Sequence, residues 1–274
     1  MKLAGKVAMV TGTSPNIGGG IVEELAAAGA SVVCVDNDPA NAQDAARYLQ
    51  SRGTSAMAVA CDVCDEAQAE AAVARTVREM GRLDILVNNA ATFNRKGVLD
   101  MGVEEWRRQI DVILTGTFLY TRHAAKAMIA SQVRGSIINI ISTAGHQGEP
   151  RNVAYGTAKS GLLNFTRSVA MELAVHGIRV NSLTPTATDA TEAVDRAKRW
   201  GRNVEDTKAR RDAMESWRKR TPLQKLPAPS DYGRAAVFLA SDDATMITGI
   251  DLRVDSGVVA RYWGWDPAAE ARGV

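Results

Sequence analysis

Residues 7–18 read VAMVTGTSPNIG, an apolar run followed at once by a turn that contains glycine. We expect a strand over Val7–Val10 and a helix that begins near Gly18. Glycine at such a turn lets the backbone approach a pyrophosphate, and the amino end of the following helix stabilises its negative charge. The order of strand, glycine turn and helix therefore predicts a cradle for the phosphates of a dinucleotide.

The rest of the chain alternates short β-branched runs with longer, alanine-rich amphipathic stretches. Further strands are expected over Ser31–Val35, Ala56–Ala60, Ile85–Val87, Ser136–Ile141, Ile178–Leu183 and Asp251–Val254. Helices are expected near residues 18–29, 39–52, 65–80, 103–131, 153–176 and 230–241. Nearly continuous apolar strands are typical of parallel strands that are covered on both faces. The pattern predicts an α/β fold with a single doubly wound (Rossmann-type), seven-stranded parallel sheet and helices on both faces.

Asp36 ends the second expected strand, where an acidic side chain can hydrogen-bond the hydroxyls of an adenosine ribose. A carboxylate there also repels the 2′-phosphate of NADP. No Lys or Arg occurs in residues 13–20 or immediately after Asp36 to offset that repulsion. Asp36 therefore favours NAD as the cofactor; the alternative is that it only caps the next helix.

The bulk composition argues against several classes of protein. The chain has 274 residues and a formal net charge of +2, which gives no electrostatic basis for nucleic acid as the main partner. No apolar run approaches the roughly 20 residues that span a bilayer. The chain leads from Met1 straight into the first strand, which leaves no room for a signal peptide. We expect a soluble, cytoplasmic protein that binds neither nucleic acid nor a membrane.

The three cysteines, Cys34, Cys61 and Cys64, are too few for a disulfide framework in a chain of this length. Cys61 and Cys64 form a CxxC pattern. A structural zinc site needs four ligands, however, and no second Cys or His pair has finger-like spacing. We expect reduced thiols and no metal site.

Residues 188–229 break the alternation with a polar, helix-prone and basic stretch. It lies between the sixth strand and the last helix–strand pair, so we interpret it as an insertion in one domain over residues 1–257. An insertion at the carboxyl end of a strand suits a substrate lid, and a pair of solvated helices is an equal alternative. Its basic residues, with Arg95 and Lys96, hint at an anionic substrate, although a run of charge is usually a solvated face.

Ser142 stands thirteen residues before Tyr155, and Lys159 follows Tyr155 by four. Tyr155 is the only one of the five tyrosines with a lysine four positions on. The same order includes the turn at 11–18, the pairs Asp62-Val63 and Asn89-Ala90, and the closing segment at 248–257. Together these motifs closely resemble the NAD-type short-chain dehydrogenase/reductase family, from about residue 6 to residue 257.

The resemblance implies a role for each matching position. The catalytic residues would be Ser142, Tyr155 and Lys159. The cofactor-binding residues would be Gly12, Ser14, Asn16, Ile17 and Gly18 at the pyrophosphate, Asp36 at the ribose, Asp62 and Val63 beside the adenine, Asn89 and Ala90 at the nicotinamide side, Pro185, Thr186 and Thr188 at the carboxamide, and Tyr155 and Lys159. The substrate would face Asn94, Ala144, His146 and Asn152.

The chemistry of this catalytic set follows from the pKa of a phenol. Free tyrosine titrates near pH 10, so bringing Tyr155 to neutrality takes roughly 4 kcal/mol of preferential stabilisation of the phenolate. Lys159 and the positive ring of NAD⁺ are two cations that can supply it. We expect Tyr155 to exchange the proton, Ser142 to hydrogen-bond the substrate oxygen, and Lys159 to tune Tyr155 and hold the ribose.

Four positions depart from the family's pattern. Asn16 replaces a glycine of the cofactor turn, Ala91 replaces a glycine after Asn89-Ala90, and Thr186 replaces the glycine after Pro185. Ile113 stands where the family has an asparagine that holds a water near the lysine, and isoleucine cannot hydrogen-bond that water. Either a backbone carbonyl holds the water alone, or the proton relay takes another route.

The end of the chain, residues 258–274, contains the aromatic stretch Tyr262-Trp263-Gly264-Trp265. Aromatic side chains concentrate burial energy, so we expect this tail to pack on something. It either closes a substrate pocket, its own or that of a neighbouring subunit, or docks against the sheet edge. The resemblance also implies a homotetramer or a homodimer.

The sequence therefore predicts an oxidoreductase that moves a hydride between NAD and a secondary alcohol or ketone, with a tyrosine as the acid–base group. A second enzymatic interpretation is an NADH-dependent ketone or 3-oxoacyl reductase. An interpretation from another class is a catalytically silent, NAD-binding regulatory protein, which Ile113 and Thr186 make conceivable. The sequence does not name the substrate.

Overall fold

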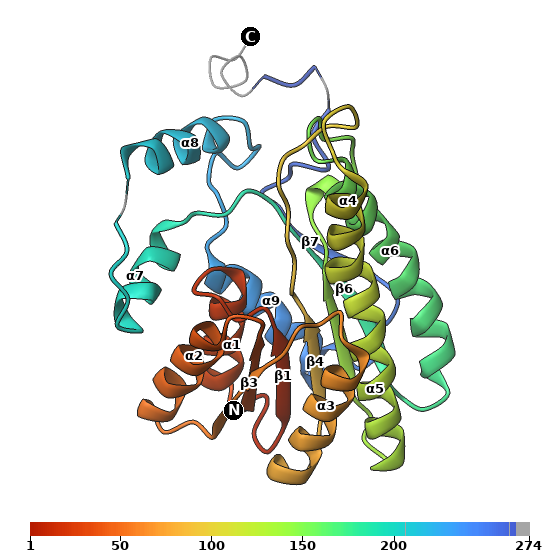
Figure 1. The fold of residues 1–274 in the computed structure, drawn as a ribbon. Helices are drawn as coiled ribbons and strands as arrows, with labels where there is room; N and C mark the ends of the chain where they lie inside the picture. The colour runs from red at the N-terminus through yellow and green to blue at the C-terminus, as the bar shows by residue number, and fades with distance from the viewer. Residues whose placement is uncertain (206, 263, 267–274) are drawn as a thin grey trace.

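The computed structural model describes residues 1–205, 207–262 and 264–266, and its strands form one parallel sheet (Figure 1). The strands are β1 Val7–Thr11, β2 Ser31–Asp36, β3 Ala56–Ala60, β4 Ile85–Asn88, β5 Ser136–Ile140, β6 Arg179–Pro185 and β7 Asp251–Val254. Their order across the sheet is β3-β2-β1-β4-β5-β6-β7. The predicted seven-stranded, doubly wound sheet is confirmed.

Helices cover both faces of this sheet (Figure 1). They are α1 Ile17–Ala27, α2 Pro39–Ser51, α3 Glu66–Met80, α4 Val103–Ile110, α5 Gly116–Ala130, α6 Val153–Ala174, α7 Thr191–Arg199, α8 Lys208–Arg218 and α9 Pro229–Ala240. Side chains of α1, α2 and α9 pack on one face of the sheet, and those of α3 and α5 on the other. Because successive strand residues point to opposite faces, Val7 enters one core and Ala8 the other. This double burial explains why the strands are apolar throughout.

The chain changes its direction of winding at β1. β2 pairs with β1 on one side, with Val7 opposite Ser31. After β3 the chain crosses back, and β4 pairs with β1 on the other side, with Ala8 opposite Ile85. Ligands of open parallel sheets bind outside the carboxyl ends of the strands at such a point. The topology therefore places a ligand site at the ends of β1 and β4.

The single helix expected over residues 103–131 is continuous in the structure, but it is not α-helical throughout. The structure has α4, then a wide π-helical turn over Asp111–Thr115, then α5. A π turn accommodates one extra residue within a helix. Ile113, in the middle of this turn, is fully buried and packs with Ile141 and Leu162. The position where the family has an asparagine is thus part of an apolar cluster.

The basic insertion contains two helices of different character. α7 buries Val194, Arg196 and Ala197 and contacts α1, whereas none of the residues of α8 is buried. Figure 1 shows α7 beside α1 and α2, with α8 farther out. Only the first of these helices therefore buries side chains against the domain. Among the described residues, no helix is both long enough and apolar enough to cross a bilayer.

The aromatic tail is described only in part, because Trp263 and residues 267–274 lie outside the described residues. Tyr262 is 65% exposed. The guanidinium of Arg261 lies 5.7 Å from the centre of the Trp265 ring. Arg261 also donates to the carbonyl oxygen of Arg220 at 3.0 Å, just after α8. These contacts do not test what the tail covers, so the two hypotheses stay predictions.

Helices α1 and α9 pack closely because each has a glycine at the contact. A Cβ on Gly20 would lie 2.4 Å from the carbonyl carbon and oxygen of Pro229, the first residue of α9. A Cβ on Gly233 would lie 2.6 Å from the carbonyl oxygen of Gly20. The backbones therefore touch, which fixes α1 against the domain.

This contact reverses the usual effect of a glycine-to-alanine change. Alanine normally stabilises a helix interior by about 1 kcal/mol relative to glycine. We expect Gly20→Ala instead to lower the free energy of unfolding by about 1–3 kcal/mol, measured by urea denaturation. Gly161→Ala in α6 is the matched control, since its Cβ would meet only methyl groups of Leu114, the nearer at 3.3 Å. Equal losses in the two variants would contradict the close-packing account.

Candidate active site

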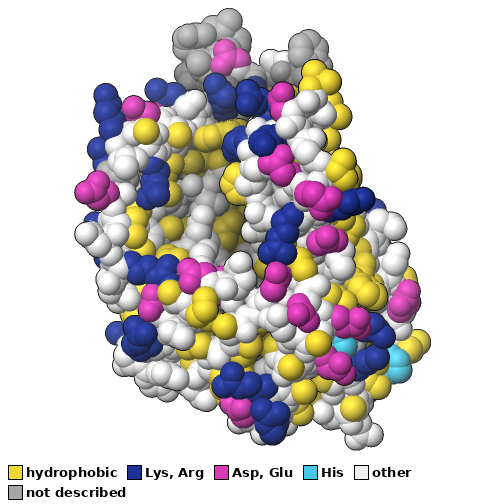
Figure 2. All heavy atoms as spheres, in the orientation of Figure 1, with side chains coloured by type: hydrophobic (Ala, Val, Ile, Leu, Met, Phe, Trp, Pro, Cys, Tyr) yellow, Lys and Arg dark blue, Asp and Glu magenta, His cyan; other side chains and the backbone are white. Residues whose placement is uncertain are grey.

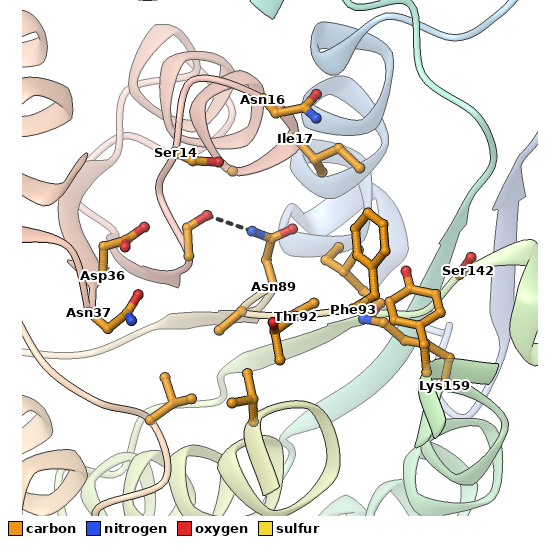
Figure 3. Close-up of a pocket in the computed structure, with 18 of the residues that line it drawn as sticks. Ser14, Asn16, Ile17, Asp36, Asn37, Asn89, Thr92, Phe93, Ser142 and Lys159 are labelled. Atoms are coloured by element: carbon orange, nitrogen blue, oxygen red, sulfur yellow. Dashed lines mark hydrogen bonds between the residues drawn. The ribbon is translucent and has the colours of Figure 1, made fainter. Parts of the chain in front are cut away.

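A cavity of about 470 Å³ opens where the winding changes direction, at the carboxyl ends of the central strands. Figure 2 shows a hollow on this face, and Figure 3 shows the cavity running from Asp36 and Asn37 at one end to Ser142 and Lys159 at the other. The predicted residues that line it are Gly12, Ser14, Asn16, Ile17, Gly18, Asp36, Asp62, Val63, Asn89, Ala90, Ser142, Tyr155, Lys159, Pro185 and Thr186. The fold therefore gathers segments that are far apart in the sequence around one cavity.

Thr188 is the one predicted cofactor residue outside the lining of this cavity. Its hydroxyl lies 3.2 Å from the carbonyl oxygen of Thr186 and 3.2 Å from the hydroxyl of Tyr232. Thr186 itself lines the cavity. In this arrangement Thr188 braces the backbone of Thr186 rather than the cavity itself.

The turn after β1 is held in a shape that only glycine permits. Gly12 has φ of +74°, and a Cβ on Gly18 would lie 1.9 Å from the carbonyl oxygen of Gly12. The side-chain amide of Asn89 donates to the carbonyl oxygens of Gly12, at 2.7 Å, and Thr11, at 3.1 Å. Asn89 thereby ties the end of β4 to the turn.

The amino end of α1 faces this turn without a side-chain cap, since Asn16 makes no capping hydrogen bond. The first N–H groups of a helix have no partner within the helix and attract anions. An uncapped helix end beside a turn too tight for any Cβ fits the pyrophosphate of a dinucleotide. The glycine turn is thus suited to the predicted cofactor.

Asp36 lies at the other end of the cavity and is 6% exposed. One of its oxygens accepts from the backbone N–H of Asp38 at 3.0 Å and from the side-chain amide of Asn41 at 3.2 Å. Burial raises the pKa of its carboxyl, and these hydrogen bonds lower it. The cations among the described lining residues are Arg108 and Lys159. Arg108 pairs with Asp62 at 3.1 Å, and Lys159 lies at the opposite end of the cavity. Neither cation therefore pairs with Asp36.

Ser142, Tyr155 and Lys159 meet at the opposite end. Tyr155 hydrogen-bonds Ser142 through their side chains. Lys159 is 2% exposed, and its ammonium donates to the carbonyl oxygen of Ile140 at 2.5 Å and lies 5.7 Å from the centre of the Tyr155 ring. Lysine and tyrosine lie one turn apart on α6, which explains their common direction. The residues can therefore act on one bound group.

Burial governs both ionisable side chains of this set. It raises the pKa of the Tyr155 phenol, against a lowering by the Ser142 hydrogen bond. It lowers the pKa of Lys159 to about 7. Both shifts favour the neutral form, as expected in a low dielectric. The lowering of the phenol's pKa by Lys159 and a bound cofactor stays a prediction, because in the protein alone desolvation prevails.

The four predicted substrate residues are placed differently. Ala144, His146 and Asn152 line a second cavity of about 680 Å³ beside the amino end of α6. His146 turns its Nε2 toward Thr184 Oγ1 at 3.0 Å and Asp251 Oδ2 at 3.1 Å.

The fourth, Asn94, lines neither of these cavities, and its side chain hydrogen-bonds Glu105 and Gln109. None of the four lines the cavity that contains Tyr155.

Sequence reasoning missed several lining residues, which are Asn37, Asn41, Cys61, Ala91, Thr92, Phe93, Arg108, Val112, Ile140 and Ile141. Phe93 is the most informative, because its ring packs edge-on against the Tyr155 ring with 5.7 Å between centres. Phe93 closely follows Asn89-Ala90 at the end of β4. Its position near that motif could have indicated that it lines the cavity. Arg108 comes from α4 and had no signal in the local pattern.

Comparison with known proteins identifies relatives along almost the whole chain. A family described as Enoyl-(Acyl carrier protein) reductase matches residues 12–259. Glucose 1-dehydrogenase 2 of Bacillus subtilis strain 168 is 35% identical over 93% of this chain and 95% of its own length.

Two solved structures have the same fold. A short-chain type dehydrogenase/reductase from Mycobacterium marinum is 30% identical with a TM-score of 0.83, covering 95% of this chain and 97% of that one. An NAD⁺-bound xylitol dehydrogenase is 27% identical with a TM-score of 0.82, covering 93% of this chain and 99% of that one.

The buried lysine gives a prediction for stability. Because burial lowers the pKa of Lys159 from 10.5 to about 7, folding carries a cost that is full below pH 7 and is relieved as the pH rises toward 10.5. We expect Lys159→Met to be more stable than the wild type by a few kcal/mol at pH 6–7. That advantage should shrink steadily up to pH 10, as followed by urea denaturation without cofactor.

Lys126→Met is the matched control, because Lys126 is an exposed lysine on α5. Its difference from the wild type should stay small at every pH. A Lys159→Met advantage that is independent of pH would contradict the buried, weakly charged state of this lysine.

Proposed function

This chain belongs to the short-chain dehydrogenase/reductase family, and on that premise we propose that it moves a hydride between NAD and a secondary alcohol with Tyr155 as the acid–base group. The family and the sugar and polyol dehydrogenases among its relatives identify an oxidoreductase that acts on alcohols. The observation that carries the finer proposal is one cavity with Ser142, Tyr155 and Lys159 at one end and Asp36 at the other.

The choice of NAD rests on the buried carboxylate of Asp36. Its position at the end of β2 suits the ribose hydroxyls, and its charge opposes a 2′-phosphate. The NAD⁺ in the related xylitol dehydrogenase agrees with this choice. In the cradle, Gly12 and Gly18 let the backbone approach the pyrophosphate, and the amino end of α1 meets its charge. A nicotinamide cofactor held by these residues would supply the acceptor for the alcohol's hydride and, in reverse, the donor for the ketone.

In the proposed mechanism Ser142 and Tyr155 hydrogen-bond the substrate oxygen together. Tyr155 takes the hydroxyl proton during oxidation and gives it back during reduction. Positive charge beside a buried phenol lowers its pKa strongly, because little water screens the interaction. Lys159 supplies such a charge when it is protonated, and its pKa of about 7 puts that change within the working range of an enzyme.

The substrate proposed is a small polyol or sugar. Glucose 1-dehydrogenase 2 and xylitol dehydrogenase act on polyhydroxylated compounds by their names. Such a substrate offers a secondary hydroxyl for Ser142 and Tyr155. The aromatic edge of Phe93 beside Tyr155 supplies an apolar surface for its carbon chain.

The proposed form of the enzyme is a homo-oligomer. Large apolar side chains on the outer surfaces of α5 and α6 are exposed, among them Phe118 at 46% and Met171 at 63%. Exposed apolar groups of this kind often mark contacts between subunits. Family membership supports the same interpretation.

The test of the function is NADH absorbance after mixing the protein and NAD⁺ with polyols, sugars, simple secondary alcohols and hydroxy acids. We expect turnover with at least one polyol or sugar. Tyr155→Phe should lower kcat at least a thousandfold and leave the Kd for NADH within about twofold, because the phenol hydroxyl alone is removed.

The outcomes separate the competing interpretations. Turnover retained in Tyr155→Phe would remove this residue from the mechanism. Turnover only in the direction of reduction, with ketones or 3-oxoacyl compounds and NADH, would favour the reductase. NADH binding without turnover on any substrate would indicate a silent, NAD-binding protein.

The cofactor preference has its own prediction. Asp36→Ala removes both the ribose hydrogen bond and the repulsion of a 2′-phosphate, so the ratio of kcat/KM with NADP⁺ to that with NAD⁺ should rise at least tenfold, or about 1.4 kcal/mol. Asp38→Ala is the matched control, since Asp38 is exposed and caps α2. An unchanged ratio in Asp36→Ala would show that this carboxylate does not select the cofactor.

A further inference from the structure

Arg196 of α7 is the largest of the fully buried side chains that the structure describes, with 1% of its surface exposed. Its Nε lies 3.0 Å from a carboxylate oxygen of Glu23 on α1, and another of its nitrogens pairs with Glu192 on α7. A buried guanidinium is costly unless it is fully partnered. A charge placed so deep in an insertion therefore calls for an explanation.

The third contact of Arg196 is with the glycine turn. Its NH1 group donates to the carbonyl oxygen of Pro15 at 3.0 Å. Ser14 and Asn16 line the cavity, whereas Pro15 and Arg196 do not. The arginine therefore binds the turn from behind, on the side away from the proposed pyrophosphate.

This hydrogen bond also orients the next amide. The Pro15–Asn16 peptide is trans, so the N–H of Asn16 points opposite to the carbonyl that Arg196 holds. A charged donor on a carbonyl polarises its peptide and makes the N–H a stronger donor. The Asn16 N–H thus points away from the carbonyl that Arg196 holds, and the charged donor strengthens it.

The packing of α7 on α1 is equally close. A Cβ on Gly19 would lie 2.6 Å from Cδ of Arg196 and 3.0 Å from the Trp200 ring. The indole N–H of Trp200 donates to Glu23 at 3.2 Å. Glycine in the first turn of α1 therefore lets α7 pack directly against that helix. This contact fixes α7 beside the glycine turn.

The same segment reaches the ribose end of the cavity. Arg202, just after α7, donates to Oδ1 of Asn41 at 2.7 Å and to Asp44 at 2.7 Å. The side-chain amide of Asn41 in turn donates to Asp36 at 3.2 Å. Residues 191–202 thus contact both the pyrophosphate turn and the partner of the ribose carboxylate.

We propose that residues 191–202, here called the clasp, position the cofactor site, with Arg196 as a positioning residue that holds the glycine turn in its anion-binding shape. The inference rests on the proposed nicotinamide cofactor. It assigns α7 to the cofactor, whereas the sequence suggested a substrate lid or a solvated helix. Because coupling is reciprocal, cofactor binding stabilises the packing of the clasp on α1 by the same free energy by which that packing strengthens cofactor binding.

The experiment measures the Kd for NADH by fluorescence, with Tm measured in parallel. We expect Arg196→Met to raise the Kd at least tenfold, while kcat at saturating NAD⁺ stays within twofold because Ser142 and Tyr155 are untouched. Arg196→Lys keeps a cation for the carboxylates but loses the planar fork that also reaches Pro15. It should fold more stably than Arg196→Met and still bind NADH at least fivefold more weakly than the wild type.

Arg199→Met is the matched control. Arg199 lies on the same helix and pairs with the same Glu23 at 3.0 Å, but its side chain is 43% exposed. Its Kd for NADH should stay within twofold of the wild type. In the wild type, NADH should also slow hydrogen exchange in α7 but not in α8, none of whose residues is buried.

Each outcome decides the proposal. Unchanged NADH binding in Arg196→Met and Arg196→Lys, or equal weakening in Arg199→Met, would overturn the clasp and leave the proposed function intact. If Arg196→Met does not fold, Arg196→Lys decides alone. A wild-type protein that binds neither NADH nor NADPH would overturn the proposed function and the clasp with it.

Discussion

The contact between Gly18 and the carbonyl of Gly12 is the constraint from which the rest of the site follows. It brings the amino end of α1 directly onto the end of β1, at the point where the sheet changes its direction of winding. The other contacts brace this turn: Asn89 holds its carbonyls from β4, and Arg196 holds it from α7. This turn, which is too tight for a side chain at Gly18, is thus supported from two sides.

Burial favours the neutral forms of the two ionisable side chains proposed to be catalytic. Tyr155 and Lys159 lie together at one end of the cavity, and desolvation moves the pKa of each toward its uncharged form. We expect this arrangement to cost stability at neutral pH and to leave both groups highly responsive to any charge that enters the cavity. The two side chains are therefore well suited to change their protonation when a charged cofactor binds.

The sequence predicted the strands well, because parallel strands buried on both faces leave continuous apolar runs. The sequence motifs, together with the family resemblance that they carry, also indicated fifteen of the residues that line the cavity containing Tyr155. Sequence reasoning failed where contacts are made across the fold. The π turn between α4 and α5 has no sequence pattern of its own, and the burial of Arg196 depends on carboxylates of which one, Glu23, lies on another helix. His146 and Asn94 stay predicted substrate residues; the partners that their side chains have in the structure, on β6, β7 and α4, had no signal in the sequence.

The wide turn at Asp111–Thr115 has a consequence for how this cleft can change. An unbroken α-helix transmits a tilt along its whole length, whereas a π turn lets the two halves adjust separately. Beyond it, Leu119 and Tyr120 of α5 stay fixed in the core, while α4 carries Arg108 into the cavity wall. The π turn therefore joins a helix that contributes to the cavity wall to a helix that is anchored in the core, and the change of hydrogen-bond register falls between these two roles.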